Sequence, residues 1–195
     1  MQQDRRRFLK LGLAGTVGFT ALGTGLRFLG VFGYADKLAP RDTPIALSTK
    51  EFAVVKALSE ILLPASPGFP SGEELGIPQR VDEEVWAAQP KLASDLKLGL
   101  QVLEHAPLLY GHLGRFTALD PETRARAFRS MLTSDNQVLV QVCSGFKLMF
   151  HFFYYNREAT WKGIGYEGPF VPTPVPPESA RAYAALLAER RGKSA

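Results

Sequence analysis

The chain has 195 residues, of which 46% are hydrophobic and 22% are charged. These proportions are those of an ordinary globular protein, and they exclude a disordered chain, a collagen-like fibre and a protein with many membrane spans. The net charge of +4 does not indicate nucleic-acid binding, because residues 1–36 contain five basic and two acidic residues, which leaves +1 for the rest of the chain.

The first 35 residues form a predicted export signal. A basic start is followed, from residue 11 to residue 26, by apolar residues, glycine and threonine alone, which is the order found in signal peptides. The basic start has the pattern of a twin-arginine motif, which the Tat translocase recognises. The motif residues are Arg5, Arg6, Phe8, Leu9 and Lys10.

Two fates of this leader are open. Gly33 and Ala35 are small residues at the positions that a signal peptidase recognises, so cleavage before Asp36 is one interpretation. Arg27 interrupts the apolar run, and the other interpretation is that the leader is retained as a membrane anchor. Residues 36–47 are a predicted linker.

Residues 48–195 are predicted to form one irregular all-α domain, because no segment alternates with a period of two between hairpin turns. Ser48 and Glu51 have the spacing of a capping box, and that helix should end before Pro64. Proline and glycine from residue 64 to 78 predict a surface loop. Further helices are expected over 81–88, 91–105, 121–132 and 137–155, with a short helix after Ser179 and the side chains of Ala182, Tyr183 and Leu186 inward.

Charged residues of the domain are expected mainly in solvent. Asp120 before Pro121 predicts a helix start, and the arginines that follow, Arg124 among them, should be exposed. The acidic run that begins at Asp82 is interpreted as a solvated helix start rather than a catalytic pair.

The helix expected over 137–155 has one narrow polar line and is otherwise apolar, with Phe146 and Phe150 on the apolar side. Such a helix is central to its own core, covered by a partner, or both. Residues 156–178 are rich in glycine and proline and should run extended over a surface of this chain or another, so we define them as a predicted wrapping segment.

No motif for a dinucleotide, phosphate, haem, iron–sulfur or metal site occurs, so no cofactor is expected in this chain. Cys143 is the single cysteine. It is either a buried small hydrophobe or half of an intermolecular disulfide. A stand-alone exported enzyme that uses His112 with Glu104 is the main alternative to a non-catalytic protein, and a membrane-tethered scaffold is another.

The run Trp161-Lys162-Gly163-Ile164-Gly165-Tyr166-Glu167-Gly168-Pro169 resembles the C-terminal signature of the gluconate 2-dehydrogenase subunit 3 family. The run Ile61-Leu62-Leu63-Pro64-Ala65, then Gly76-Ile77-Pro78 and Asp82, resembles that family's first helix, loop and second helix. The similarity covers residues 48–177. The glycines common before the Trp-Lys pair are replaced here by residues 157–160.

This resemblance implies a small, non-catalytic subunit. Its expected partner is a large FAD-dependent subunit of the glucose-methanol-choline (GMC) type, with a multihaem cytochrome c, and therefore haem c, as a further subunit. It also implies that the Tat leader escorts the folded pair to the periplasm, where the complex associates with the inner membrane. The residues expected at the partner interface are Cys143, Phe146, Phe150, Trp161, Lys162, Tyr166 and Phe170.

Overall fold

The structure is a computed structural model that describes residues 34–40, 42–112, 114–169 and 176–193. The chain divides into two compact units, residues 1–37 and residues 38–195. In the first unit the described element is a short 3-10 helix, η1 (Ala35–Lys37). Several predicted residues lie outside the described part of the chain, so their roles remain predictions. They are Arg5, Arg6, Phe8, Leu9, Lys10 and Phe170.

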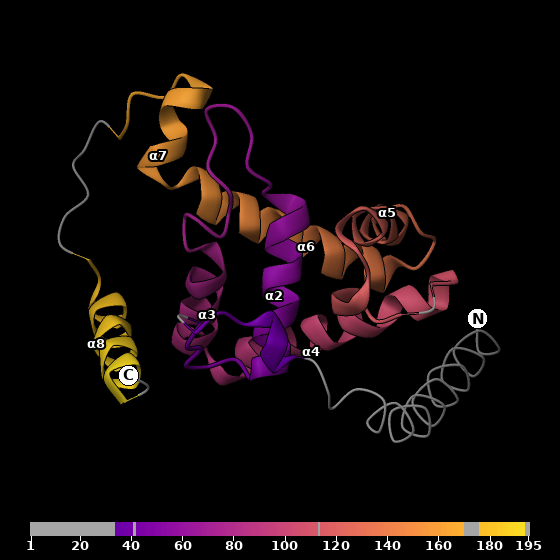
Figure 1. The fold of residues 1–195 in the computed structure, drawn as a ribbon, viewed down its shortest axis with the longest axis horizontal. Helices are drawn as coiled ribbons and strands as arrows, with labels where there is room; N and C mark the ends of the chain where they lie inside the picture. The colour runs from indigo at the N-terminus through magenta and orange to yellow at the C-terminus, as the bar shows by residue number, and fades with distance from the viewer. Residues whose placement is uncertain (1–33, 41, 113, 170–175, 194–195) are drawn as a thin grey trace, which may run out of the picture. The chain divides into compact units, whose positions relative to one another are not determined.

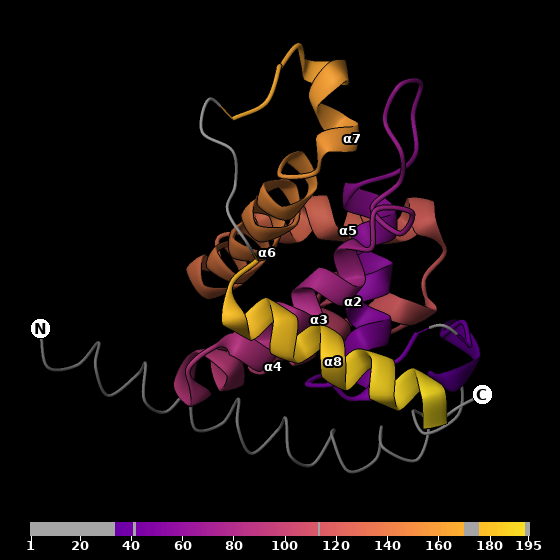
Figure 2. The same ribbon diagram turned by 90° about the vertical axis from the view of Figure 1, so that its left-hand side faces the viewer.

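The second unit is built from helices (Figures 1 and 2). Over the described residues no strand forms, and one isolated bridge joins Ser66 to Phe69. The prediction of an all-α fold is therefore confirmed. Its elements are α2 (Thr49–Leu62), α3 (Ile77–Ala87), α4 (Pro90–His105), η2 (Ala106–Tyr110), η3 (Phe116–Ala118), α5 (Pro121–Leu132), α6 (Gln137–Tyr155), α7 (Glu158–Trp161), η4 (Lys162–Ile164) and α8 (Glu178–Lys193).

Helix α2 is at the centre of the core and packs against α3, α4, α5 and α6 (Figure 1). Its side chains Phe52, Val55 and Leu58 are almost completely buried. The predicted capping box is present, because the Glu51 carboxylate accepts a hydrogen bond from the Ser48 backbone N–H at 2.8 Å. A helix that packs on four others is stabilised chiefly by tertiary burial, so α2 positions the rest of the fold.

The predicted helix starts agree with the structure where the signal is local. Asp120 caps α5 by accepting a hydrogen bond from the Thr123 N–H at 3.0 Å, and α6 has the predicted bounds. Helix α3 begins at Ile77, four residues before the predicted start. The predicted helix was too short because proline is compatible with the first turn of a helix, and Pro78 occupies that turn. Gly76, in the left-handed region (φ 66°), precedes it.

Two charged side chains that were expected in solvent are buried. Asp82 is 0% exposed and accepts hydrogen bonds from three backbone N–H groups of residues 45–47 and from the Tyr183 hydroxyl. Arg124 is also buried and donates to the carbonyl oxygens of Phe116 and Leu119. Both predictions were wrong because the hydrogen-bond partners of these side chains belong to other elements, which local sequence does not show. A charged side chain can be buried only when such partners are present.

The predicted extended course of residues 156–178 is wrong at its start. Residues 158–164 form α7 and η4, which directly follow α6. Thr160 is buried, and its hydroxyl donates to the Tyr154 and Arg157 carbonyl oxygens at 3.3 and 2.8 Å. These bonds satisfy carbonyls at the end of α6 and allow the chain to turn.

Helix α8 is longer than the short helix predicted after Ser179, and it packs on α3 (Figure 2). Tyr183 is its single buried residue. Ala182 and Leu186, which were expected to face inward, are exposed. Helix α8 is therefore attached to the body mainly through Tyr183, with Ala180 and Leu187 partly buried beside it.

Candidate interaction surface

Helix α6 has one buried face, and three predicted interface residues lie on it. Cys143, Phe146 and Phe150 all belong to the hydrophobic core, and Cys143 and Phe150 are 0% exposed. Burial raises the pKa of the Cys143 thiol to about 12. A thiol in this position has no access to a partner's cysteine, so the structure supports the buried hydrophobe and corrects the interface assignment of Cys143 and Phe150. Phe146 is 5% exposed and its interface role stays a prediction.

The opposite side of α6 exposes large apolar side chains to solvent. The exposed fractions are 64% for Val138, 73% for Leu148, 66% for Phe152 and 43% for Tyr155. At 100° per residue Leu148 and Tyr155 fall within the line that the sequence suggested to be polar, and Phe152 and Val138 lie beyond its Gln141 edge. At 1.5 Å per residue the set extends for about 25 Å along the helix. We call these four residues the α6 face.

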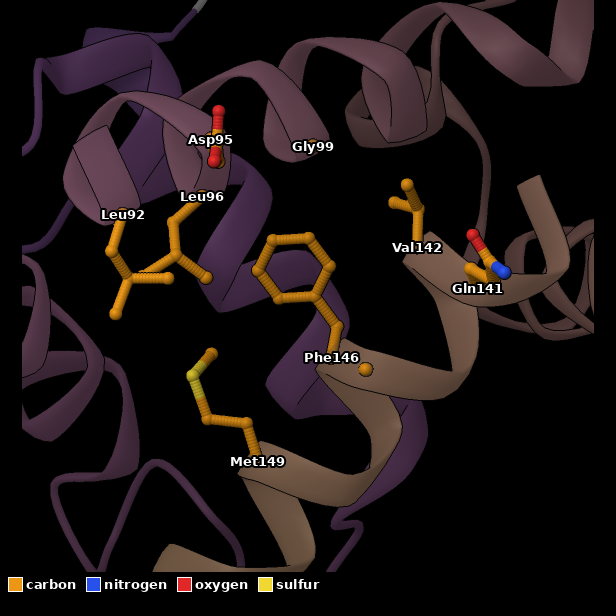
Figure 3. A pocket seen from close by; sticks show the side chains of 9 residues that line it. Leu92, Asp95, Leu96, Gly99, Gln141, Val142, Phe146 and Met149 are labelled. Atoms are coloured by element: carbon orange, nitrogen blue, oxygen red, sulfur yellow. The ribbon is translucent and has the colours of Figure 1, made fainter. Parts of the chain in front are cut away.

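A shallow apolar hollow between α4 and α6 adjoins this face (Figure 3). Its volume is about 180 Å³, and its walls include Leu92, Leu96, Phe146 and Met149. Gly99 allows the two helices to approach closely, because a Cβ at that position would lie 2.9 Å from the Phe146 ring. The hollow is lined mainly by hydrocarbon, so it suits an apolar side chain better than a polar ligand.

The aromatic residues that follow α6 extend the exposed apolar surface beyond its C-terminal end. The Trp161 indole N–H donates to the Tyr155 carbonyl oxygen at 3.0 Å, and the Trp161 and Tyr166 rings are edge to face with centroids 5.3 Å apart. Trp161 is half-buried, whereas Lys162, Ile164 and Tyr166 are exposed. Lys162 and Tyr166 are therefore accessible and Trp161 partly so, and their contact with a partner stays a prediction.

We call residues 161–169 the aromatic segment. Two contacts fix the position of this segment and of the loop before α3. A Cβ on Gly163 would lie 2.4 Å from the Phe69 ring, so only glycine allows the present packing. The Tyr154 hydroxyl donates to the Pro70 carbonyl oxygen at 2.6 Å. Burial is the main reason that the pKa of Tyr154 is raised above its ordinary value.

Glu104 and His112, the residues of the enzyme hypothesis, make structural contacts. The buried Glu104 carboxylate accepts from the Thr117 N–H at 3.1 Å and from the Thr117 hydroxyl at 2.8 Å, which orders η3. The backbone N–H of His112 donates to the Pro107 carbonyl oxygen. It is His105 that lies near a charged group, with Nε2 3.3 Å from Lys50 Nζ. Burial and then Lys50 lower the pKa of His105.

The described residues form neither a metal cluster nor a membrane-spanning helix. Among residues 34–40, 42–112, 114–169 and 176–193, no group of three or more His, Cys, Asp or Glu side chains is arranged to hold a metal ion. Within the same ranges, no helix has the length and apolar character needed to cross a membrane.

The sequence analysis missed Leu148 and gave Phe152 and Tyr155 no separate role. Helical projection alone would have placed all three on the side of α6 opposite Phe150, at positions where a stand-alone globular protein usually has polar residues. The signal was present in the sequence as apolar residues within the polar line.

These features define an all-helical protein whose most distinctive surface is an apolar face suited to contact with another protein. The family model of gluconate 2-dehydrogenase subunit 3 matches residues 49–168, and the chain belongs to this family. The match begins with α2 and ends just after η4, so it includes the α6 face and most of the aromatic segment. No curated protein and no solved structure matches the chain with significance.

Proposed function

We propose that this chain is the non-catalytic small subunit of a flavin-dependent dehydrogenase. Its partner is a large FAD-containing subunit of the GMC type, and a multihaem cytochrome c is a further subunit of the complex. The chain brings the folded flavoprotein through the Tat pathway and then stabilises it in the periplasm, at the inner membrane. FAD and haem belong to the partners, and this chain contributes binding surface.

The observation that carries this proposal is the α6 face in a member of this family. Three residues of the face, Val138, Leu148 and Phe152, are each more than 60% exposed. Burying such a side chain contributes about 1.5–3 kcal/mol. Leu148, Phe152 and Tyr155 are neighbours at helical spacing, and exposed clusters of large apolar side chains are typical of subunit contacts.

The aromatic segment supports the same surface, because aromatic side chains often dominate the binding energy of interfaces. Tyr166 is exposed, and Trp161 is held by bonds within this chain. The rings are therefore positioned before a partner binds, which reduces the entropy cost of association. We expect Trp161→Ala to weaken the complex more than it destabilises the isolated subunit.

The interface is tested with two glutamate substitutions in α6. Phe152→Glu places a charge in the α6 face, and the matched control Lys147→Glu changes an exposed polar position of the same helix. Each is co-expressed with the large subunit, and the amount of flavin that co-purifies is measured. We expect Phe152→Glu to reduce recovery at least about tenfold, which corresponds to about 1.4 kcal/mol. Equal recovery from both variants would contradict a contact through this face.

The escort role is tested separately through the leader. Arg5→Lys with Arg6→Lys removes the paired arginines but keeps the charge. Both this chain and the large subunit should then remain in the cytoplasm, as followed by flavin content of the periplasmic fraction. Normal export of the large subunit with the altered leader would contradict the escort role while leaving the subunit role intact.

A further inference from the structure

One buried carboxylate joins the beginning of the helical body to its C-terminal helix. Asp82 Oδ1 accepts from the N–H groups of Ala46 and Leu47 at 3.1 and 2.7 Å. Its Oδ2 accepts from the Ile45 N–H at 2.7 Å and from the Tyr183 hydroxyl at 2.6 Å. Residues 45–47 belong to no helix. The Asp82 carboxylate therefore accepts the hydrogen bonds that backbone carbonyl oxygens would accept in a helix or a sheet.

The attachment of α8 depends on the same point. The Tyr183 ring packs against Trp86 with centroids 5.7 Å apart, and its hydroxyl also receives a hydrogen bond from the Gln79 side chain. Both of these partners are on α3, as Asp82 is. Because Tyr183 is the single buried residue of α8, this cluster contributes most of the burial that holds the helix.

The C-terminal turns of α8 also reach the segment that precedes residue 45. The Arg190 guanidinium donates to the Pro44 carbonyl oxygen, and Arg191 Nε donates to the Thr43 hydroxyl at 3.3 Å. Helix α8 therefore contacts residues 43 and 44 directly and reaches residues 45–47 through Asp82. Neither α8 nor residues 43–47 lie within the family match at 49–168. The two segments that flank the matched domain therefore contact each other.

We propose that α8 is a latch for residues 43–47, and that the two segments open and close together. When α8 leaves, Asp82 Oδ2 loses the Tyr183 hydroxyl and is opened to water, and residues 43 and 44 lose their contacts with Arg190 and Arg191. Residues 43–47 then lack the cover that excludes water from their hydrogen bonds, and they open locally at low cost. The core burial of Leu47 and the bond that Lys97 Nζ donates to the Ala46 carbonyl oxygen at 2.6 Å do not depend on α8, so loss of α8 weakens the hold on residues 43–47 without unfolding the body. This holds whether or not the chain binds a flavoprotein.

Amide hydrogen exchange of the full chain tests the latch. Tyr183→Phe keeps the ring and removes the hydroxyl, and Tyr183→Ala removes both. Leu186→Ala is the matched control, because Leu186 is exposed on the same helix. We expect the amides of residues 45–47 to exchange about tenfold faster in Tyr183→Phe, or about 1.4 kcal/mol in the opening equilibrium, and faster still in Tyr183→Ala. Leu186→Ala should leave them unchanged.

Exchange in α2 and α6 identifies the kind of opening. The latch predicts that amides in these core helices keep their wild-type rates in all three variants, while α8 and residues 45–47 accelerate together. Unchanged exchange of residues 45–47 in both Tyr183 variants would overturn the proposal. Equal acceleration in α2 and α6 would also overturn it, because α8 would then belong to the global core rather than to a local latch.

Discussion

Arg124 is the residue whose replacement tests the account of the core most sharply. Its Nε donates to the Phe116 carbonyl oxygen at 3.0 Å, its Nη2 donates to the Leu119 carbonyl oxygen at 2.6 Å, and its Nη1 pairs with Glu60. One guanidinium thus joins α5 to α2 and orders the turn around η3. The Glu60 side chain is half exposed, so that ion pair contributes less than the two bonds to carbonyls.

Arg124→Lys keeps the charge and removes the planar fork. A single ammonium group cannot replace Nε and Nη2 at two separate carbonyl oxygens. Each hydrogen bond from a charged donor contributes about 1.5–3 kcal/mol, so the loss of one bond, with a carbonyl left unpaired, should lower the free energy of unfolding by about 2–4 kcal/mol. For a chain of this size the melting temperature should fall by about 4–16 °C.

Urea unfolding followed by circular dichroism measures this difference, and Arg126→Lys provides the control. Arg126 is two residues further along α5, is exposed, and pairs with Glu122 at 2.6 Å. Its replacement should change the free energy of unfolding by less than about 0.5 kcal/mol. If Arg124→Lys were as stable as the control, the guanidinium would not organise this junction, and the reasoning would be refuted.

Three further predictions concern the thiol, one histidine and the aromatic segment. Burial raises the pKa of Cys143 to about 12, so a thiol reagent at about pH 8 should label the unfolded chain and spare the folded one; fast labelling of the folded chain would show an exposed thiol. Burial lowers the pKa of His105, so the unfolded chain binds its proton more readily, and the free energy of unfolding should fall as the pH drops below about 6.5. His105→Gln should flatten that part of the urea-unfolding profile, and an unaltered profile would exclude this histidine as the cause. Gly163→Ala should lower the free energy of unfolding by about 1–3 kcal/mol, because the added Cβ would collide with the Phe69 ring. In the control Gly145→Ala the added Cβ meets nothing within 4 Å, so this change should be neutral or stabilising. Equal effects of the two changes on the free energy of unfolding would contradict the tight packing at Gly163.

The elements whose signals are local could be predicted from the sequence. The capping box of Ser48 and Glu51, the cap at Asp120 and the bounds of α6 each depend on residues a few positions apart, and the structure agrees with them. Propensity and capping act at this range, so the chemistry is visible in the sequence. The family resemblance was also visible in short motifs, and the family match confirms it.

The predictions that failed concern residues whose partners are distant in the sequence. Asp82 accepts hydrogen bonds from residues 45–47, which precede it by 35 to 37 positions, and from Tyr183, which follows it by 101 positions. No local pattern indicates either contact. The interface prediction disagrees with the structure at Cys143 and Phe150, because periodicity identifies an apolar face without showing what covers it. In the structure that face is covered by the chain's own helices, and the opposite face of α6 is the exposed one.

The central claim is that this chain is a binding subunit for a flavoprotein. The most direct measurement is to purify the tagged chain from its native host under mild conditions and to determine the mass and the absorbance spectrum of what elutes. The account predicts a stoichiometric complex with a large subunit and a flavin spectrum that the chain itself lacks after the complex is separated. A colourless monomer, recovered while the host's flavin-dependent dehydrogenase elutes elsewhere, would contradict it.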